Sequence, residues 1–337
     1  MNIIMNRRHG RSAVAILLAL ATAMAVGACG SSDSGSTATA AGDGGKGATL
    51  RIGFITIKGV PDGPEGWADK RGELLPALKP AGITAIKWVP FQNGPPLQQA
   101  LVGGSIDAGI LGDTPALVGH ANGVKERLVN QTRTGLDAWL IGHKGGPSSV
   151  SALKGTTVAT QTGSYMYRYL VGLLQEQGLD GDVKLGNLTT PASTAALTKG
   201  AIGAAAQPVN AAVQLAAAGF PVLDKASQHT GLAGSTVTVV SEAFLAKHPD
   251  FPKVWNAARA AAIRSVKAHP VAFWTFESGA QPKALPISLV KQAYPLSNYA
   301  EAPFTTTGTA GLQRTLKFLL DAKLARGAFD LEGWKAP

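Results

Sequence analysis

Cysteine is nearly absent from this chain of 337 residues, in which Cys29 is the only one. A single cysteine excludes an internal disulfide and leaves no pair of thiols for a zinc site. The main apolar run, 13–26, has about 14 residues, whereas a membrane-spanning helix needs roughly 20. We therefore expect neither a disulfide scaffold nor a permanent transmembrane helix.

Recognisable catalytic motifs are also missing. The histidines are scattered, and none has another histidine, a cysteine or a carboxylate at metal-ligand spacing. The chain has no Gly-x-Ser-x-Gly elbow, no phosphate-binding Gly-Lys-Ser/Thr loop and no cysteine nucleophile after Cys29. These absences favour a binding protein without catalytic residues, metal or cofactor, with an enzyme as the competing class.

Acidic residues are in the minority, because 21 Asp and Glu face 31 Lys and Arg, for a net charge of +10. The basic residues are spaced singly, without a basic run or interleaved aromatic residues, so the sequence predicts no nucleic-acid partner. A general attraction of small anions is the better use of this charge.

The N-terminus has the organisation of a signal peptide. Arg7, Arg8 and Arg11 precede the apolar run, which ends in Val-Gly-Ala-Cys at 26–29. Small residues directly before the sole cysteine match a bacterial lipobox, so we predict a lipoprotein signal over 1–28, lipidation of Cys29 and an extracytoplasmic protein anchored to the cell membrane. Ordinary secretion is the alternative, and the export route, Sec or twin-arginine, stays open. Segment 29–47 is rich in Gly, Ser, Ala and Thr, which predicts a flexible tether.

Short apolar runs alternate with amphipathic stretches along the rest of the chain. This pattern predicts an α/β protein with a mostly parallel sheet. The expected strands are 49–55, 85–89, 108–111, 139–141, 157–159 and 236–240. The expected helices are 74–79, 95–102, 114–121, 165–177, 191–198, 210–218, 254–268 and 309–324.

An internal echo suggests two similar lobes. Segments 95–108 and 191–204 both have a proline, a short helix, a glycine stop and a buried strand. Because ligands of open α/β sheets bind at the carboxyl ends of strands, binding residues are expected directly after each copy. They are Asp113 and Thr114 in the first, and Gln207 and Asn210 in the second.

Further candidates follow from the chemistry that a small anion requires. Thr162, Gly163, Ser164 and Tyr165 follow a strand and open a long helix, where amides without a partner and nearby hydroxyls suit an anion. Plain N-capping by Thr162 or Ser164 is the alternative. The remaining predicted ligand-binding residues are Lys58, as the cation, and Asn93, as a neutral donor. The alternatives are a solvated loop lysine for Lys58, and a turn or cap residue for Asn93, Gln207 and Asn210.

From Leu50 to about Trp334 the chain resembles the solute-binding proteins of ABC importers in the aliphatic sulfonate, taurine and nitrate group. The likeness is carried by RIGF at 51–54, RGEL at 71–74, GPPL at 94–97, GSIDA at 104–108, GDTP at 112–115 and LKG at 153–155. The resemblance implies a two-lobed periplasmic-binding fold of the second type. Lobe one would be 48–138 with 238–337, and lobe two would be 139–237. It also implies a monomeric receptor that passes a small organic anion to a membrane permease.

Two departures from the group bear on the ligand. An insertion at 60–67 lengthens the loop after the first strand. Where many relatives have Trp-Asp-Pro-Tyr, this chain has AQPV at 206–209, which removes an acid that could pair with a ligand amine. Taurine-like zwitterions are thereby disfavoured unless an acid elsewhere substitutes, and an aliphatic sulfonate is preferred. Nitrate, a sulfate ester, a thiamine-pyrimidine precursor or an enzyme of the same fold are the alternatives.

Overall fold

The computed structural model describes residues 47–56, 58–281 and 283–337. The predicted signal peptide, Cys29 and nearly all of the predicted tether lie outside these residues. Among the helices of the described residues, none is both long and apolar enough to cross a membrane.

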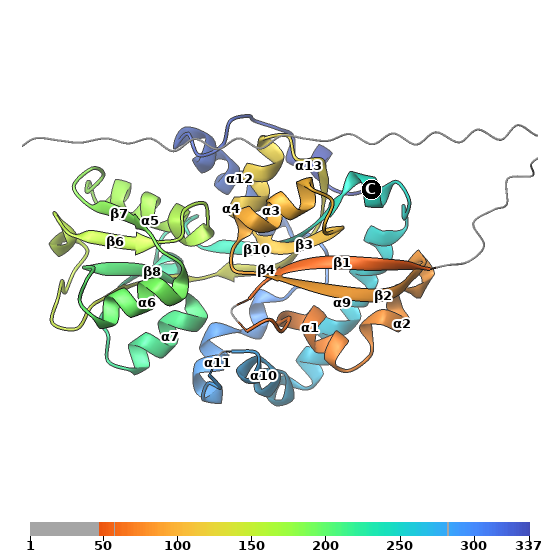
Figure 1. Ribbon diagram of the computed structural model, residues 1–337, viewed down its shortest axis with the longest axis horizontal. Helices are drawn as coiled ribbons and strands as arrows, with labels where there is room; N and C mark the ends of the chain where they lie inside the picture. The colour runs from red at the N-terminus through yellow and green to blue at the C-terminus, as the bar shows by residue number, and fades with distance from the viewer. Residues whose placement is uncertain (1–46, 57, 282) are drawn as a thin grey trace, which may run out of the picture. The chain divides into compact units, whose positions relative to one another are not determined.

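Two five-stranded sheets organise the described chain (Figure 1). The first sheet has the order β2-β1-β3-β10-β4. Its strands are β1 (Ala48–Ile55), β2 (Ile83–Phe91), β3 (Ala108–Gly112), β10 (Gly234–Ser241) and β4 (Glu126–Leu136). The second sheet has the order β7-β6-β8-β5-β9. Its strands are β7 (Lys184–Asn187), β6 (Thr157–Thr160), β8 (Ala204–Pro208), β5 (Ala138–Gly142) and β9 (Val222–Lys225).

The prediction of a mostly parallel sheet is wrong, because both sheets are mixed. Strand β1 pairs in parallel with β2 and β3, whereas β10 is antiparallel to β3 and β4. The second sheet repeats this arrangement, with β6 parallel to β7 and β8, and β5 antiparallel to β8 and β9. The reason is topological: the chain leaves the first sheet after β4, builds the second, and returns as β10.

Helices cover both faces of each sheet (Figure 1). On the first sheet, α2 (Leu74–Leu78) and α9 (Phe251–Ala268) pack on one face, and α3 (Gly94–Val102), α4 (Asp113–Ala121) and α12 (Thr306–Asp321) pack on the other. On the second sheet, α5 (Tyr165–Glu176) opposes α6 (Thr190–Thr198) and α7 (Val209–Ala217). We call each sheet with its helices a lobe; the boundaries at 138 and 238 stay a prediction.

Local pattern accounts for most of these elements. In β1, Leu50, Ile52 and Phe54 alternate along the strand and are buried on one face, and Gly53 is buried on the other face, which helices also cover. The echo has its structural counterpart, since α3 leads to β3 and α6 leads to β8. All eight predicted helices are present within a few residues of their expected bounds.

Besides the short helices α8 (Glu242–Leu245) and α13 (Leu331–Trp334), three longer helices were not predicted: α1 (Gly63–Lys70), α10 (Pro270–Gly279) and α11 (Ile287–Ala293). The 60–67 insertion, expected to be a loop, contains the start of α1, with Asp62 at the N-cap position and Pro64 in the first turn. Helix α11 packs on α7, so this part of the C-terminal segment touches the second lobe as well as the first. The remaining elements are four 3-10 turns.

Candidate functional site

A cavity of about 200 Å³ lies between the two lobes, within the single compact unit formed by residues 47–337. Its walls come from strand ends and helix starts of both sheets, as the rule for α/β folds predicts. Four predicted residues line it: Asn93, Ser164, Tyr165 and Asn210. A cavity of this size suits a small solute.

The start of α5 forms one side of the cavity. Ser164 is the N-cap, because its hydroxyl oxygen accepts from the Tyr167 amide at 3.1 Å while its proton goes to the Gln161 carbonyl at 2.6 Å. The amides of Tyr165 and Met166 are in the first turn, where no intrahelical acceptor exists, and both residues line the cavity. The helix end therefore offers backbone donors, whereas the Ser164 proton is already used.

Thr162 and Gly163 lie beside this helix start but not in the cavity lining. The Thr162 amide donates to Asn187 Oδ1 at 3.1 Å, and its side chain is exposed. Gly163 has a φ of +79° and approaches Pro95, so its role in the structure is the tight turn before α5.

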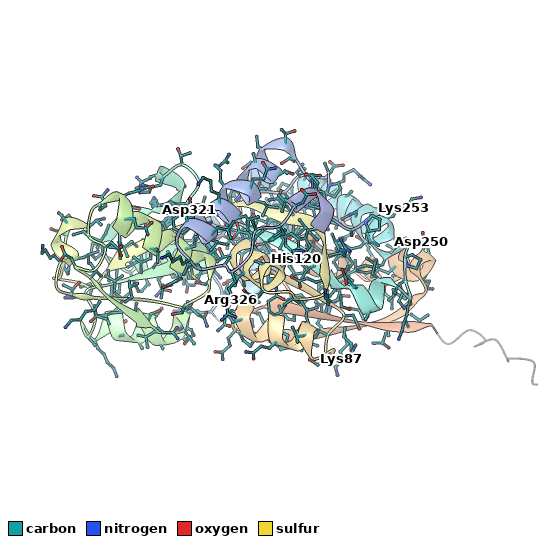
Figure 2. The ribbon with its side chains drawn as sticks, turned by 90° about the horizontal axis from the view of Figure 1, so that it is seen from above. Lys87, His120, Asp250, Lys253, Asp321 and Arg326 are labelled. Atoms are coloured by element: carbon teal, nitrogen blue, oxygen red, sulfur yellow. The ribbon has the colours of Figure 1, made fainter. Side chains whose placement is uncertain are left out.

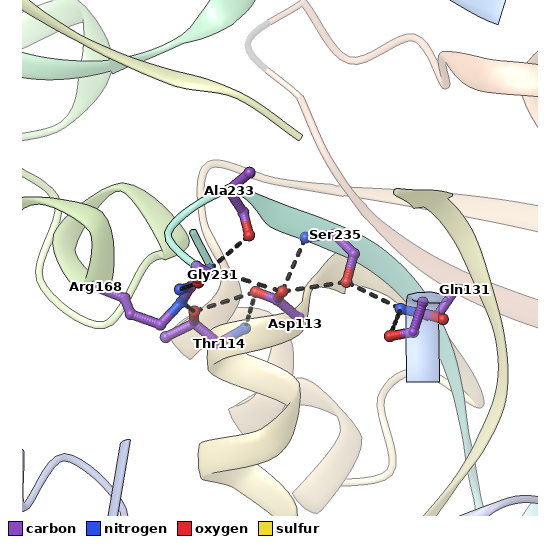
Figure 3. Close-up of polar contacts among 8 residues, drawn as sticks. Asp113, Thr114, Gln131, Arg168, Gly231, Ala233 and Ser235 are labelled. Atoms are coloured by element: carbon purple, nitrogen blue, oxygen red, sulfur yellow. Dashed lines mark hydrogen bonds and ion pairs between the residues drawn. The ribbon is translucent and has the colours of Figure 1, made fainter. Parts of the chain in front are cut away.

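Asp113 and Thr114 are buried in a polar network next to the cavity rather than in its lining (Figure 3). Asp113 Oδ2 accepts from the amide and the hydroxyl of Ser235 at 2.8 and 3.1 Å. Thr114 Oγ1 accepts from Arg168 Nε at 3.1 Å. These two predicted ligand-binding residues thus bond to β10 and α5. The strand-end rule places them beside the cavity, but it does not distinguish a contact with a ligand from a contact between the lobes.

Arg168 is the centre of that network. It is fully buried on α5, and it donates to the carbonyls of Gly231 and Ala233 at 2.8 and 3.2 Å (Figure 3). Its Nη2 lies 3.9 Å from Asp113 Oδ2. One side chain therefore links a helix of the second lobe to the crossover that leads into β10 and to the start of α4.

Lys58 and Gln207 are also outside the cavity lining. The Lys58 ammonium donates to the Gly279 carbonyl at 2.5 Å in an exposed position. Gln207 is fully buried, and its Nε2 donates to Ser193 Oγ at 2.9 Å. Lys58 is therefore not the cation of this cavity, and Gln207 joins β8 to α6.

The arginine that lines the cavity is Arg133 on β4, which the sequence analysis missed. Its Nη2 donates to the Ala293 carbonyl at 2.6 Å, and its guanidinium carbon lies 4.9 Å from the centre of the Tyr294 ring. Its Nε has no hydrogen-bond partner in the described part of the chain. A guanidinium stays protonated at every physiological pH and is well suited to a planar or tetrahedral oxyanion.

Two carboxyl groups at the start of α1, those of Asp62 and Glu65, also line the cavity. Burial raises the pKa of Glu65 to about 7, and the nearby Arg259 guanidinium opposes this shift. Asp62 is exposed, and its Oδ2 accepts from the Tyr294 hydroxyl at 3.2 Å.

Several hydroxyl and amide groups around the cavity are without a partner in the described residues. They are the Tyr299 hydroxyl, the Thr132 hydroxyl and Asn93 Oδ1. Asn210, by contrast, donates to Gln281 Oε1 at 3.0 Å. Buried polar groups usually find a partner, so those three leave hydrogen-bonding capacity that a bound solute would satisfy.

Apolar side chains make up much of the rest of the lining, and most of them come from strands and helix starts. They include Phe54, Trp88, Leu136, Met166 and Val209. No histidine or cysteine of the described residues lines the cavity, and no group of three metal-ligating side chains occurs among them. The arrangement suits the binding of a solute that has a charged end and an apolar part.

Comparisons with curated proteins give two partial matches. The chain is 32% identical over 99 residues to a protein of Bacillus subtilis named for aliphatic sulfonate binding, covering 30% of that protein. It is 33% identical over 122 residues to a protein of Escherichia coli with the same name, covering 38%. The matches thus span about a third of each relative, and no family model matches the chain.

Solved structures match over most of the chain. The periplasmic aliphatic sulphonate binding protein SsuA of Escherichia coli has a TM-score of 0.65 at 24% identity, covering 86% of this chain and 97% of that one. SsuA of Xanthomonas axonopodis pv. citri, bound to MOPS, has a TM-score of 0.66 at 25% identity and covers 83% and 94%. The desulfurization enzyme DszB has a TM-score of 0.67 at 17% identity and covers 86% and 96%. These likenesses confirm the predicted periplasmic-binding fold and the resemblance to sulfonate-binding solute receptors.

Proposed function

We propose that this protein is the extracytoplasmic receptor of an ABC importer, and that it captures an aliphatic sulfonate between its two lobes. The observation that carries the proposal is the Arg133 guanidinium, which faces an apolar cavity between the lobes without a carboxylate partner within 4.0 Å in the described residues. The similarity to proteins named for sulfonate binding supports the choice of ligand.

The geometry offers several donors that act together. Micromolar affinity requires about 8 kcal/mol, and one charge-assisted hydrogen bond contributes about 1.5 to 3 kcal/mol. Arg133, the first-turn amides of α5 and the Thr132 and Tyr299 hydroxyls would together reach that range. The apolar lining would cover the alkyl chain.

Capture is proposed to be a population shift toward the closed arrangement of the lobes. A solute that contacts both lobes stabilises the closed state by the difference in its affinity for the two states. Arg133 belongs to the first lobe and the start of α5 to the second, so an anion that bridges them would provide this difference. A membrane permease would then receive the unmodified solute from the monomeric receptor.

Binding of the full-length chain, purified in detergent, tests the ligand class. Calorimetric titration should give micromolar affinity for butanesulfonate and weak or no binding for nitrate, methyl sulfate and thiamine-pyrimidine precursors. Binding confined to the latter three compounds would refute the sulfonate proposal. Recovery of a chemically altered butanesulfonate would instead show that the protein is an enzyme. This alternative is considered because the enzyme DszB has a similar fold.

Lipid anchoring through Cys29 is part of the same proposal. A tether of the length of 29–47 would keep the binding unit close to a membrane permease. Cells grown with a labelled fatty acid should incorporate label into the wild-type chain and not into Cys29→Ser. Label retained by the serine variant would refute this part.

A further inference from the structure

Residues 229–233, which lead into β10 and which we call the return crossover, lie along one stripe of α5 (Figure 3). Arg168, Gly172 and Glu176 are four residues apart in this helix, so they share one face. Arg168 donates to two carbonyls of the return crossover. A Cβ on Gly172 would lie 2.6 Å from Leu232 Cδ2, so the missing side chain makes room for this buried leucine.

His229 holds the other end of the return crossover through two carboxylates. Its Nδ1 lies 2.6 Å from Glu176 Oε2, and its Nε2 lies 2.9 Å from each carboxylate oxygen of Asp224 on β9. A neutral imidazole has one N–H, so one of its nitrogens would direct a lone pair at a carboxylate. An imidazolium has two N–H donors and satisfies both acids. The geometry therefore favours the charged form of His229.

We propose that His229 is a positioning residue for solute capture. As an imidazolium it fastens the return crossover to α5 and β9, and its loss of a proton in alkaline surroundings releases the crossover and weakens capture. The effect on capture rests on the proposed function, whereas the fastening can be measured without a ligand.

The charged and titratable groups around His229 come from α5, β9, α12 and the connection between β4 and β5. They are Glu176 and Tyr169, Asp224 and Lys225, Arg314, and Asp137. Neither Lys225 nor Arg314 forms an ion pair within 4.0 Å in the described part of the chain. The two carboxylates that contact His229 are therefore offset mainly by its own charge.

These neighbours set the pH range in which the fastening acts. Burial by itself would lower the pKa of His229, but the hydrogen bonds and charges of Asp224 and Glu176 outweigh burial and raise the pKa. The folded-state pKa thus exceeds the unfolded value of about 6.5, so the fastening is complete below about pH 6.5. It is lost as the pH rises through the folded-state pKa.

Release of His229 would act on a connection between the lobes. The return crossover brings the chain from the second sheet back to the first, and the Arg168 that holds it also donates to Thr114 of α4. A crossover that is held at one end only leaves the lobe arrangement less defined. Closure on a solute would then have to remove more conformational freedom, so the affinity falls.

Hydrogen exchange of the ligand-free, full-length chain in detergent tests the fastening. Protection of peptides that span 229–233 is compared in the wild type and in His229→Gln, which carries no charge at any pH. At about pH 6 the wild type should be about tenfold better protected, the effect of about one pKa unit. At about pH 9 the two proteins should agree within about twofold.

His269→Gln is the control, because His269 is exposed and its Nδ1 faces the Ser265 carbonyl instead of a carboxylate. This variant should match the wild type at both pH values. Glu176→Gln removes the more exposed of the two carboxylates and keeps His229, and it should narrow the difference in protection between the two pH values. Equal protection in the wild type and His229→Gln at about pH 6 would overturn the proposal.

Calorimetric titration of the same proteins with butanesulfonate tests the effect on capture. The wild type should bind about threefold to tenfold more tightly than His229→Gln at about pH 6, and equally at about pH 9. The ratio at each pH cancels the effect of other titrating groups, such as Glu65. Equal affinities despite a released crossover would overturn the role in capture. Absence of binding at both pH values would overturn the proposed function and this role together, while the exchange result decides the fastening.

Discussion

At the scale of single residues, charged side chains line the cavity, and the residues around them in the sequence give no sign of this position. Arg133 is one of several polar residues in β4, and Asp62 stands in a segment rich in Pro and Gly. What distinguishes them is that each lines the cavity without an ion-pair partner in the described chain. A guanidinium that faces a largely apolar cavity is costly unless a ligand offsets its charge, so Arg133 is expected to control binding.

Arg133→Gln should weaken binding of butanesulfonate by about tenfold to a hundredfold, because it removes a charge-assisted contact. Calorimetric titration measures the change. Arg326→Gln makes the same change of charge at an exposed position and should leave the affinity within twofold (Figure 2). An equal loss in the two variants would show that general electrostatic attraction, not Arg133, is responsible.

Because Glu126 is buried, we expect the stability of the protein to depend on pH. Glu126 is fully buried, and burial raises its pKa to about 8 against the opposing hydrogen bond from Gln98. Because the folded-state pKa exceeds the unfolded value of about 4.5, its contribution is full below pH 4.5 and is lost as pH rises through 8. The free energy of unfolding should therefore fall between pH 5 and pH 8 by about 2 to 4 kcal/mol more in the wild type than in Glu126→Gln.

Urea denaturation at the two pH values measures this difference. Glu332→Gln, at a position with a largely exposed side chain, is the matched control and should follow the wild type. A Glu126→Gln variant with an unchanged pH dependence would show that Glu126 does not stay protonated in the folded protein.

At the scale of elements, the beginnings of two helices define opposite sides of the cavity. Helix α5 begins with a conventional serine cap and offers free amides, whereas α1 begins at a residue whose carboxylate is turned to Tyr294. One helix start therefore suits an anion, and the other presents an acid. In α5 the N-cap side chain of Ser164 accepts from an amide of the first turn, whereas in α1 the Gly63 amide donates to Glu277 and not to the N-cap residue.

Ser164→Ala should lower the free energy of unfolding by about 1 kcal/mol, the usual effect of losing an N-cap. Sulfonate affinity should fall only a few-fold, because the Ser164 proton is already donated to the Gln161 carbonyl. Thr162→Ala, at the neighbouring exposed hydroxyl, should change neither quantity measurably. A large loss of affinity with unchanged stability would mean that Ser164 binds the ligand directly.

At the scale of the whole molecule, the lobes are joined by buried polar contacts as well as by the chain crossovers. Arg168 of α5 bonds Thr114 and two carbonyls that precede β10, and Asn210 of α7 bonds Gln281 next to Tyr294. The bonds of Arg168 hold the crossover region in place. Gln281, which accepts from Asn210 of the second lobe, also bonds Tyr294, and Tyr294 in turn donates to Asp62. Any change of lobe arrangement has to preserve or break these bonds.

Arg168→Met should destabilise the protein by about 3 to 5 kcal/mol, because it leaves the carbonyls of Gly231 and Ala233 and the buried Asp113 without this partner. Arg127→Met removes a partly exposed pair with Glu242 and should cost about 1 kcal/mol or less. Urea denaturation measures both. A loss at Arg168 no larger than that at Arg127 would show that the buried network does not support the fold.

Much of the architecture could be predicted because it depends on local pattern. The alternation in β1, the Pro-to-Gly limits of α3 and the Ser164 cap of α5 all involve residues within one or two turns of each other. The echo of segments 95–108 and 191–204 located two strand ends, and Asn210 after the second copy reaches the cavity. The start of α1 had a usable signal, Asp62 followed by Pro64, which the surrounding glycines concealed.

Neighbouring residues and ordered motifs are enough to predict the alternation of helices and strands, the helix start at Ser164 and the resemblance to sulfonate receptors. Tertiary packing, by contrast, sets which charged side chains line the cavity between the lobes. Tyr294 and Asp62 are 232 positions apart, and the contact between them exists because α1 and the segment after α11 pack together. Lys58 and Arg133 carry the same charge, but only Arg133 lines the cavity. The fold determines how deeply each side chain is buried and in which direction it points.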